Sequence, residues 1–268
     1  MARILQLSDL HVVAPGRRVG GVLDTPALLR AGIDRLLGRL EGIGPIDAVL
    51  VTGDVSDDGS EESYAFARAE LVRLGLPLLV IPGNHDRRDG LRAAFADTGC
   101  DMPARGPIDW SAEVNGTLVV GLDTLIEGRD GGSLRARTLL HLRDALASAG
   151  ARPVVVALHH PPLMTGIRFM DAIGLDNIAE LAEVLQGFEG ALHVLAGHVH
   201  GVHHAMIARH PVLTAPSMGS AFTLDRRRDA PLGFMAGPTG CAVLDTGPGG
   251  TWAAVMIDEF DGPFPFQA

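Results

Sequence analysis

Five short apolar runs in this chain each end in side chains that bind metal ions or transfer protons. Each run is rich in Val, Ile and Leu, and such continuous hydrophobicity is typical of strands buried on both faces. The groups that follow the runs are, in chain order, Asp9 and His11, then Asp54, then Asn84 and His85, then His159 and His160, then His198 and His200. In open α/β sheets, functional groups gather beyond the carboxyl ends of the strands. We therefore expect these five loops to converge on one crevice.

The segments between the apolar runs predict helices. Residues 24–42 place Leu and Ile side chains at helical spacing, with Thr25 as the expected cap and Pro26 at the first helical position. A second helix is expected over residues 60–75, with its first residue as the cap, and a third over residues 133–150. Strand then helix, repeated along the chain, indicates an α/β layered fold.

The last part of the chain, from about residue 205, has a different pattern. Three strand-like segments at 210–218, 240–246 and 251–257 are separated by turns rich in Gly and Pro, with no strong helix between them. No linker, low-complexity tract or internal repeat marks a second domain. We therefore expect a single domain over residues 1–268, with residues 205–268 as a mostly β extension.

Composition argues against several classes of protein. The formal net charge of −10 disfavours a nucleic-acid partner, because phosphate backbones attract clustered cations. No stretch reaches the roughly 18 uncharged apolar residues of a membrane span, and the N-terminus turns polar too soon for a secretory signal. Cys100 and Cys241 are too few for a disulfide framework. We expect a cytoplasmic protein with neither a nucleic-acid nor a membrane partner.

The chemistry of the strand-end groups points to a pair of metal ions. Carboxylate and amide oxygens mixed with imidazoles, without thiolates, suit Mn²⁺, Fe, Co²⁺ or Zn²⁺. Seven such side chains are too many for one ion and suit two, with an Asp bridging them. Paired ions about 3.5–4 Å apart are a recurrent solution for displacement at phosphorus. The nucleophile would then be a metal-bound hydroxide, and no GxSxG motif suggests a serine triad instead.

Five blocks of the sequence, in order, resemble the calcineurin-like metallophosphoesterase superfamily. They are DLH at 9–11, GDVSDDG at 53–59, GNHD at 83–86, HHPP at 159–162 and GHVH at 197–200. The last two resemble the bacterial branch of class III cyclic-nucleotide and glycerophosphodiester phosphodiesterases. The resemblance implies a four-layer α-β-β-α sandwich, with two mixed sheets flanked by helices and the C-terminal extension completing the second sheet. Members of the family often form dimers, so a homodimer is open here.

The resemblance also assigns roles to individual residues. One metal ion would be held by Asp9, His11 and His200, and the other by Asn84, His159 and His198. Asp54 and a hydroxide would bridge two ions drawn from Mn²⁺, Fe²⁺/Fe³⁺, Co²⁺ and Zn²⁺. The remaining assignments are catalytic, with His85 as the acid that protonates the leaving alkoxide and Asp57 as the group that orients it.

Several polar residues near these blocks have simpler interpretations. Asp57 could be an ordinary loop carboxylate, and His160 is expected to support the ligands without binding metal. The remaining residues with expected structural roles are His141, His193, His210 and Asp123. One of His203 and His204 could touch substrate, although solvent exposure explains both.

The substrate is less constrained than the metal site. The loop at 163–175 could be the wall of a small-molecule pocket, a lid or a dimer contact, and Phe222 could stack on a base. We expect a metal-dependent phosphoric diester hydrolase acting on small phosphodiesters, with 3′,5′-cAMP first. The alternatives are a glycerophosphodiester phosphodiesterase, a promiscuous phosphomonoesterase or phosphonate monoester hydrolase, and a catalytically silent metal-binding scaffold.

Overall fold

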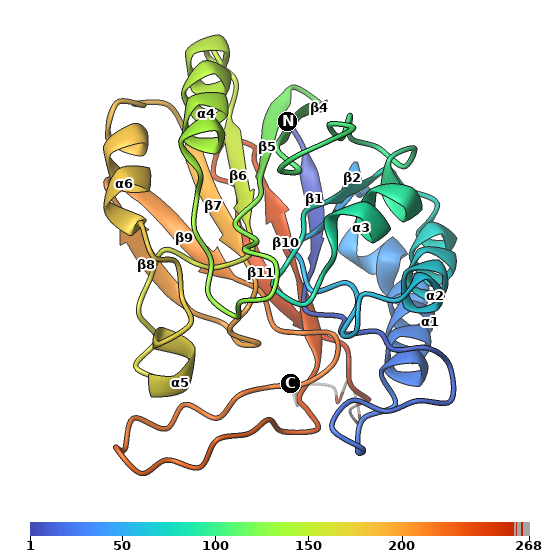
Figure 1. Cartoon of the computed structure of the whole chain (residues 1–268). Helices are drawn as coiled ribbons and strands as arrows, with labels where there is room; N and C mark the ends of the chain where they lie inside the picture. The colour runs from blue at the N-terminus through green and yellow to red at the C-terminus, as the bar shows by residue number, and fades with distance from the viewer. Residues whose placement is uncertain (260, 262–263, 265–268) are drawn as a thin grey trace.

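The chain folds into two mixed β-sheets packed face to face with helices outside them, as a computed structural model of residues 1–259, 261 and 264 describes (Figure 1). The strand orders are β11-β10-β1-β2-β3 in the five-stranded sheet and β4-β5-β6-β7-β9-β8 in the six-stranded sheet. The four-layer α/β sandwich expected from the sequence is therefore confirmed. No helix within the described residues is long and apolar enough to cross a membrane.

The first sheet combines N-terminal and C-terminal strands. Its strands are β1 (Arg3–Leu7), β2 (Ala48–Val51), β3 (Leu78–Val80), β10 (Gly240–Asp245) and β11 (Trp252–Met256). β1, β2 and β3 are parallel, whereas β10 runs antiparallel to β1. Its outer face packs on α1 (Thr25–Ile43), α2 (Glu61–Leu71) with the 3-10 turn η1 (Val72–Leu74), and α3 (Arg88–Phe95).

The second sheet has a parallel centre and two antiparallel edges. Its strands are β4 (Trp110–Val114), β5 (Thr117–Leu122), β6 (Val154–Leu158), β7 (Leu192–Ala196), β8 (His204–Ile207) and β9 (His210–Thr214). The helices α4 (Ala136–Ser148) and α6 (Ile178–Gln186) cover its outer face. The short helix α5 (Arg168–Asp171) lies away from both sheets, near the carboxyl ends of the central strands (Figure 1).

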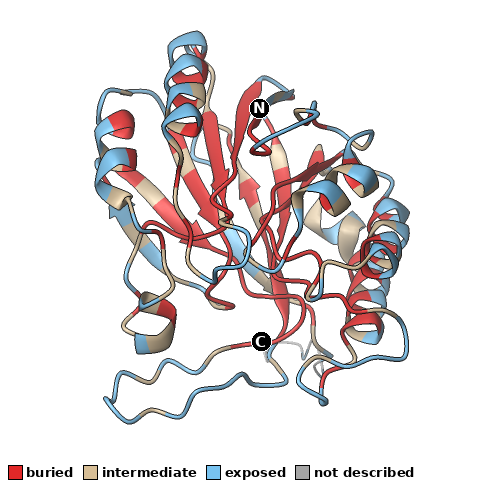
Figure 2. Cartoon of the chain, viewed as in Figure 1, coloured by how far each residue is buried: buried red, intermediate tan, exposed pale blue. Residues whose placement is uncertain are grey.

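The C-terminal extension completes both sheets rather than the second alone. β8 and β9 extend the six-stranded sheet, as expected, but β10 pairs with β1, with Arg3 opposite Asp245. The expectation that residues 205–268 complete only the second sheet is therefore corrected. One core between the sheets includes Leu50 from the first and Val155 from the second, both fully buried (Figure 2). This shared core supports our proposal that residues 1–268, whose last few positions lie largely outside the described residues, form one domain.

The cap of α1 differs from the prediction. Asp24, not Thr25, caps the helix, because its Oδ1 accepts a hydrogen bond of 3.1 Å from the backbone N–H of Ala27. Thr25 instead donates its hydroxyl to the carbonyl oxygen of His11 at 2.7 Å. The beginning of α1 is thereby tied to the loop that follows β1. The Ser60 cap of α2 is confirmed, since its side chain accepts from the N–H of Ser63.

Replacing the cap tests its contribution to stability. Asp24→Ala is expected to lower the free energy of unfolding by about 1 kcal/mol, the usual effect of losing an N-cap. Chemical denaturation measures this change. Glu41→Ala, at an exposed position near the other end of the same helix, is the matched control and should change stability by less than about 0.5 kcal/mol. Equal midpoints for the two variants would show that α1 does not depend on this cap.

Candidate metal centre

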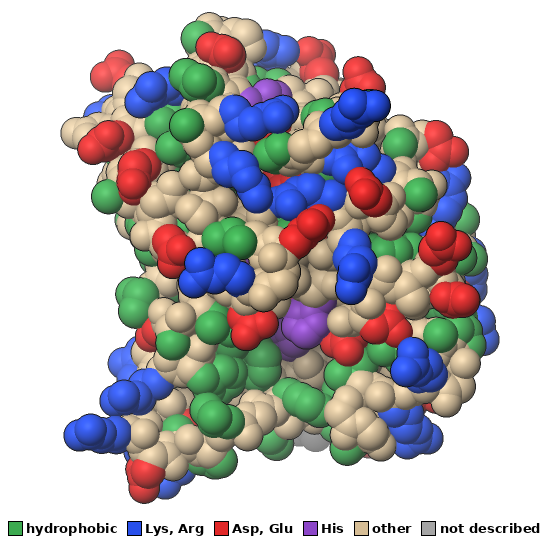
Figure 3. Space-filling view, viewed as in Figure 1, with side chains coloured by type: hydrophobic (Ala, Val, Ile, Leu, Met, Phe, Trp, Pro, Cys, Tyr) green, Lys and Arg blue, Asp and Glu red, His purple; other side chains and the backbone are tan. Residues whose placement is uncertain are grey.

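The loops after β1, β2, β3, β6 and β7 meet at one end of the sandwich, as expected. Figure 3 shows histidine atoms in a recess there, with hydrophobic atoms beside them. Potential ligand atoms of Asp9, His11 and His200 lie within 4.8 Å of one another, and so do those of Asp9, Asp54 and His159. Parallel strands from both sheets thus deliver these groups to one crevice.

Asp54 lies between two groups of side chains. Its Oδ2 is 3.5 Å from His11 Nε2 on one side and 3.3 Å from His159 Nε2 on the other. On the first side, the Nε2 atoms of His11 and His200 are 3.0 Å apart, and His200 Nε2 is 3.4 Å from Asp9 Oδ1.

The second group is centred on the Asn84 side chain. Asn84 Oδ1 lies 3.1 Å from His159 Nε2 and 3.1 Å from His198 Nδ1. The two groups flank the same Asp54 carboxylate, which is a geometry suited to two ions with one shared ligand.

The orientation of the imidazoles fits metal binding. In each of four histidines, one ring nitrogen faces the centre while the other bonds to an oxygen outside it. The outer partners are Asp57 Oδ1 for His11 (3.0 Å), Thr52 O for His159 (2.8 Å), Ile173 O for His198 (3.1 Å) and Ser220 Oγ for His200 (2.8 Å). Such outer partners fix the tautomer of a ligating histidine and aim its lone pair inward.

Charge in the crevice also fits bound cations. Burial raises the pKa of Asp9. At Asp54, burial acts to raise the pKa, but His159 and His11 outweigh it and hold the pKa well below its usual range. No arginine in the described part of the chain forms an ion pair with either carboxylate. Two buried carboxylates without a permanent cation favour a site that binds positive ions.

The backbone is strained at the same positions. Of the seven non-glycine residues with positive φ in the described residues, five belong to this cluster, namely Asp9 (54°), His11 (46°), Asp54 (50°), His198 (71°) and His200 (47°). Non-glycine residues rarely adopt this conformation, and such strain tends to gather at functional sites. The sequence contains no signal for it.

Two glycines allow the loops to approach closely. A Cβ on Gly83 would lie 2.1 Å from Asp54 Oδ1, and one on Gly53 would lie 2.5 Å from His159 Nδ1. Gly53 also has a φ of 93°. Any side chain at these positions would push apart the groups that flank the centre.

His85 lies at the mouth of the crevice, where its side chain is 38% exposed. Its Nδ1 donates to the backbone carbonyl oxygen of Asp57 at 3.1 Å and is 3.5 Å from the Asp57 carboxylate. That carboxylate is closer to His11 Nδ1, at 3.0 Å. Asp57 therefore contacts His85 mainly through its backbone, and the role of its carboxylate as the group that orients His85 stays a prediction.

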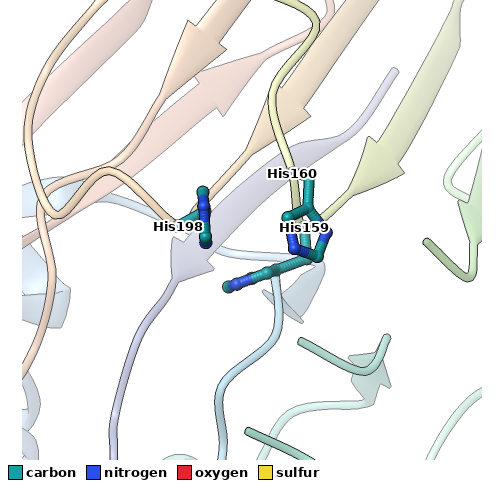
Figure 4. A group of neighbouring side chains, drawn as sticks. All are labelled: His159, His160 and His198. Carbon is teal, nitrogen blue, oxygen red and sulfur yellow. The ribbon is translucent and has the colours of Figure 1, made fainter. Parts of the chain in front are cut away.

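His160 lies beside the cluster, with one ring nitrogen within 4.8 Å of potential ligand atoms of His159 and His198. Figure 4 shows His159 and His160 after β6, with His198 approaching from the end of β7. His160 Nδ1 pairs with Thr124 Oγ1 at 2.7 Å, and its Nε2 donates to Asp130 O at 3.0 Å. Burial, reinforced by His159, lowers its pKa to about 3. Both ring nitrogens are engaged, so His160 supports the loop as expected.

Sequence reasoning missed two serines that support the centre. Ser217 donates its hydroxyl to the carbonyl oxygen of Asp9 at 2.7 Å, and Ser220 pairs with His200 Nδ1. Both follow β9 and lie about 200 residues from Asp9. No local signal could have identified them, because the contacts exist only once the chain has folded.

The Ser220 hydroxyl provides a test of this support. Ser220→Ala is expected to weaken metal binding by about 10- to 100-fold, as loss of a partner behind a ligating histidine usually does. Titration calorimetry with Mn²⁺ measures the affinity. Thr223→Ala removes an exposed hydroxyl three residues later and is the matched control. Unchanged affinity in Ser220→Ala would mean that His200 needs no such support.

Several known proteins are similar to this chain. The family model described as calcineurin-like phosphoesterase matches residues 2–202. The chain is 30% identical to the probable glycerophosphodiester phosphodiesterase GpdQ of Arcobacter nitrofigilis, over 98% of this chain and 96% of that protein. It is 35% identical to the 3′,5′-cyclic adenosine monophosphate phosphodiesterase CpdA of Pseudomonas aeruginosa, over 83% and 81% of the respective chains. A dimetal phosphatase from Danio rerio shares the fold, with a TM-score of 0.66 at 14% identity over 96% and 97% of the respective chains.

Proposed function

The chain belongs to the calcineurin-like phosphoesterase family, and from that premise we propose that it is a dinuclear-metal phosphodiesterase of small diesters, with 3′,5′-cyclic nucleotides as the first choice. The observation that carries this proposal is the crevice itself, in which two groups of ligand atoms flank the Asp54 carboxylate. Relatives named as cyclic-nucleotide phosphodiesterases support the choice of substrate.

The proposed ligand sets follow the two sides of Asp54. Asp9, His11 and His200 would hold one ion. Asn84, His159 and His198 would hold the other, and Asp54 would be shared. The mixed oxygen and imidazole donors suit Mn²⁺, Fe, Co²⁺ or Zn²⁺. When bound, such a pair of ions lowers the pKa of a coordinated water and neutralises charge on the phosphoryl oxygens.

His85 is the proposed general acid. Its Nδ1–H is held by the carbonyl oxygen of Asp57, which leaves Nε2 free to contact the substrate at the mouth of the crevice. In its protonated form, the imidazole donates that Nε2 proton to the leaving oxygen as the P–O bond breaks. Its backbone N–H donates to Asp54 Oδ1 at 2.9 Å, so the same loop supports both the acid and the shared ligand.

The proposed partner and cellular location rest on the net charge of the chain and on its two unpaired cysteines. A net charge of −10 disfavours a nucleic-acid partner, and a pair of bound cations would supply the local positive charge that a small anionic substrate needs. Both cysteines are buried and unpaired, which supports a cytoplasmic location. Homodimer formation stays a prediction.

A small substrate panel with Mn²⁺ tests the proposed function. We expect hydrolysis of bis(4-nitrophenyl) phosphate and a higher kcat/KM for 3′,5′-cAMP than for glycerophosphoethanolamine. Preference for glycerophosphoethanolamine would instead support the activity for which the Arcobacter relative is named. A protein that binds two ions yet hydrolyses no ester would be a silent scaffold, and the proposal would fail.

A further inference from the structure

A cavity of about 350 Å³ includes the open side of the proposed metal centre and an apolar wall beside it. The hydrophobic side chains that line it are Val19, Leu23, Phe169, Met170, Ile173, Phe222 and Phe234. Three of these lie in the loop at 163–175, which therefore contributes a pocket wall. The centre and the cavity are continuous, since His11, His198 and His200 line both. A diester bound at the centre would place one of its organic groups in this cavity.

Two of the aromatic side chains that line the cavity lie near the base of a long loop, residues 221–238, which is drawn in orange-red below α5 in Figure 1. Ala221 and Met235 form an antiparallel bridge, with backbone hydrogen bonds of 3.1 and 2.7 Å. Phe222 directly follows Ala221 and Phe234 directly precedes Met235, so the bridge brings both residues to the same part of the chain. Both side chains line the cavity.

Aromatic contacts hold these walls in place. Phe222 stacks on the His200 ring, with centroids 4.3 Å apart and an interplanar angle of 24°. The Phe169 ring contacts the Phe222 ring edge-on, with centroids 5.3 Å apart. Phe234 covers Gly20, where a Cβ would lie 2.9 Å from the Phe234 ring. Ring-edge and ring-face contacts of this kind favour a flat occupant.

Apart from the side chains of the metal centre and His85, the polar groups that line the cavity are already hydrogen-bonded. The hydroxyls of Thr25 and Ser220 are engaged by His11 O and His200 Nδ1, at 2.7 and 2.8 Å. No arginine lines the cavity within the described residues, and Asp57 is the one lining acid besides Asp54. Away from the metal centre and His85, the cavity therefore provides few unused partners for the hydroxyls of glycerol or for a cationic alcohol.

We propose that the walls made by Phe169, Phe222 and Phe234 form a subsite for a flat, uncharged ring of the diester, the nucleobase of a cyclic nucleotide. This inference rests on the proposed function and names its substrate class at residue level. Phe222 touches His200 and so also supports the centre. Phe169 and Phe234 are the positions at which base recognition can be separated from metal binding.

The test compares 3′,5′-cAMP with its abasic analogue, 1-deoxyribose 3′,5′-cyclic phosphate. Stacking on aromatic side chains typically changes affinity by about 5- to 150-fold per base. We expect wild-type kcat/KM to favour cAMP by a factor in this range. Phe169→Ala and Phe234→Ala should each reduce that preference, because kcat/KM for cAMP should fall more than kcat/KM for the abasic analogue. Leu232→Ala, at an 80% exposed position on the loop of residues 221–238, is the matched control and should keep the preference for cAMP.

Binding of adenosine to the metal-free protein gives a second readout that needs no turnover. Saturation-transfer NMR should detect adenosine on the wild type and on Leu232→Ala, with a weaker signal on Phe234→Ala. Equal kcat/KM for the two cyclic phosphates, or no adenosine binding, would overturn the subsite. Hydrolysis of neither cyclic phosphate nor of bis(4-nitrophenyl) phosphate would instead overturn the proposed function, while adenosine binding would still decide the subsite.

Discussion

Asp54→Ala is expected to lose paired metal binding and activity together. The Asp54 carboxylate is within 3.5 Å of ring nitrogens from both ligand groups, so its removal deprives both ions of their shared anionic ligand. After incubation with Mn²⁺ and dialysis, the metal content measured by elemental analysis should fall from two ions per chain to one or none. Hydrolysis of bis(4-nitrophenyl) phosphate should fall to the limit of detection.

Asp58→Asn is the matched control for that experiment. Asp58 belongs to the same loop, but its carboxylate contacts Arg17 and Ser60 rather than the centre. An amide oxygen keeps the acceptor for the Ser60 N–H, so this variant should retain two ions and most of its activity. An Asp54→Ala protein that still held two ions would refute the bridging assignment. Loss of metal in both variants would point to general disruption of the loop.

The candidate ligands could be predicted because metal ligands occur in short sequence motifs that can be recognised without the structure. A ligand must be one of a few residue types, and the end of a buried strand fixes where it lies. Asp9, Asn84 and His159 each lie one to three residues beyond the end of an apolar run, so sequence reasoning placed them in one crevice beyond the carboxyl ends of the strands. The strands were visible for a related reason: β2 and β6 are buried along their whole length, which produces continuous apolar runs.

Contacts between distant parts of the chain could not be predicted in this way. The hydrophobic pattern of β10 indicates a strand but does not say that its partner is β1, more than 230 residues earlier. Thr25 is a good cap by type, yet the fold uses its hydroxyl to bind His11 O and leaves capping to Asp24. The edge strands β4 and β8 escaped prediction because they are partly exposed and lack continuous apolar runs.

His85→Ala is expected to keep both ions and lose turnover. Its imidazole is directed at the mouth of the crevice by the Asp57 carbonyl oxygen and contributes no atom to either proposed ligand set. General acid catalysis by a positioned side chain is typically worth about 10²- to 10⁴-fold, so kcat should fall by that range for diesters with poor leaving groups. Diesters that release nitrophenolate need little protonation and should be affected less.

The effect of the leaving group on kcat shows whether His85 acts as the general acid or has only a structural role. Comparing kcat for methyl phenyl phosphate and methyl 4-nitrophenyl phosphate changes the basicity of the leaving oxygen and little else. His204→Ala, an exposed histidine that does not line the cavity, is the matched control and should slow neither substrate. If His85→Ala slowed both diesters equally, His85 would act by binding the phosphoryl group instead of protonating the leaving oxygen. If metal were lost as well, His85 would be assigned as a ligand instead of the acid.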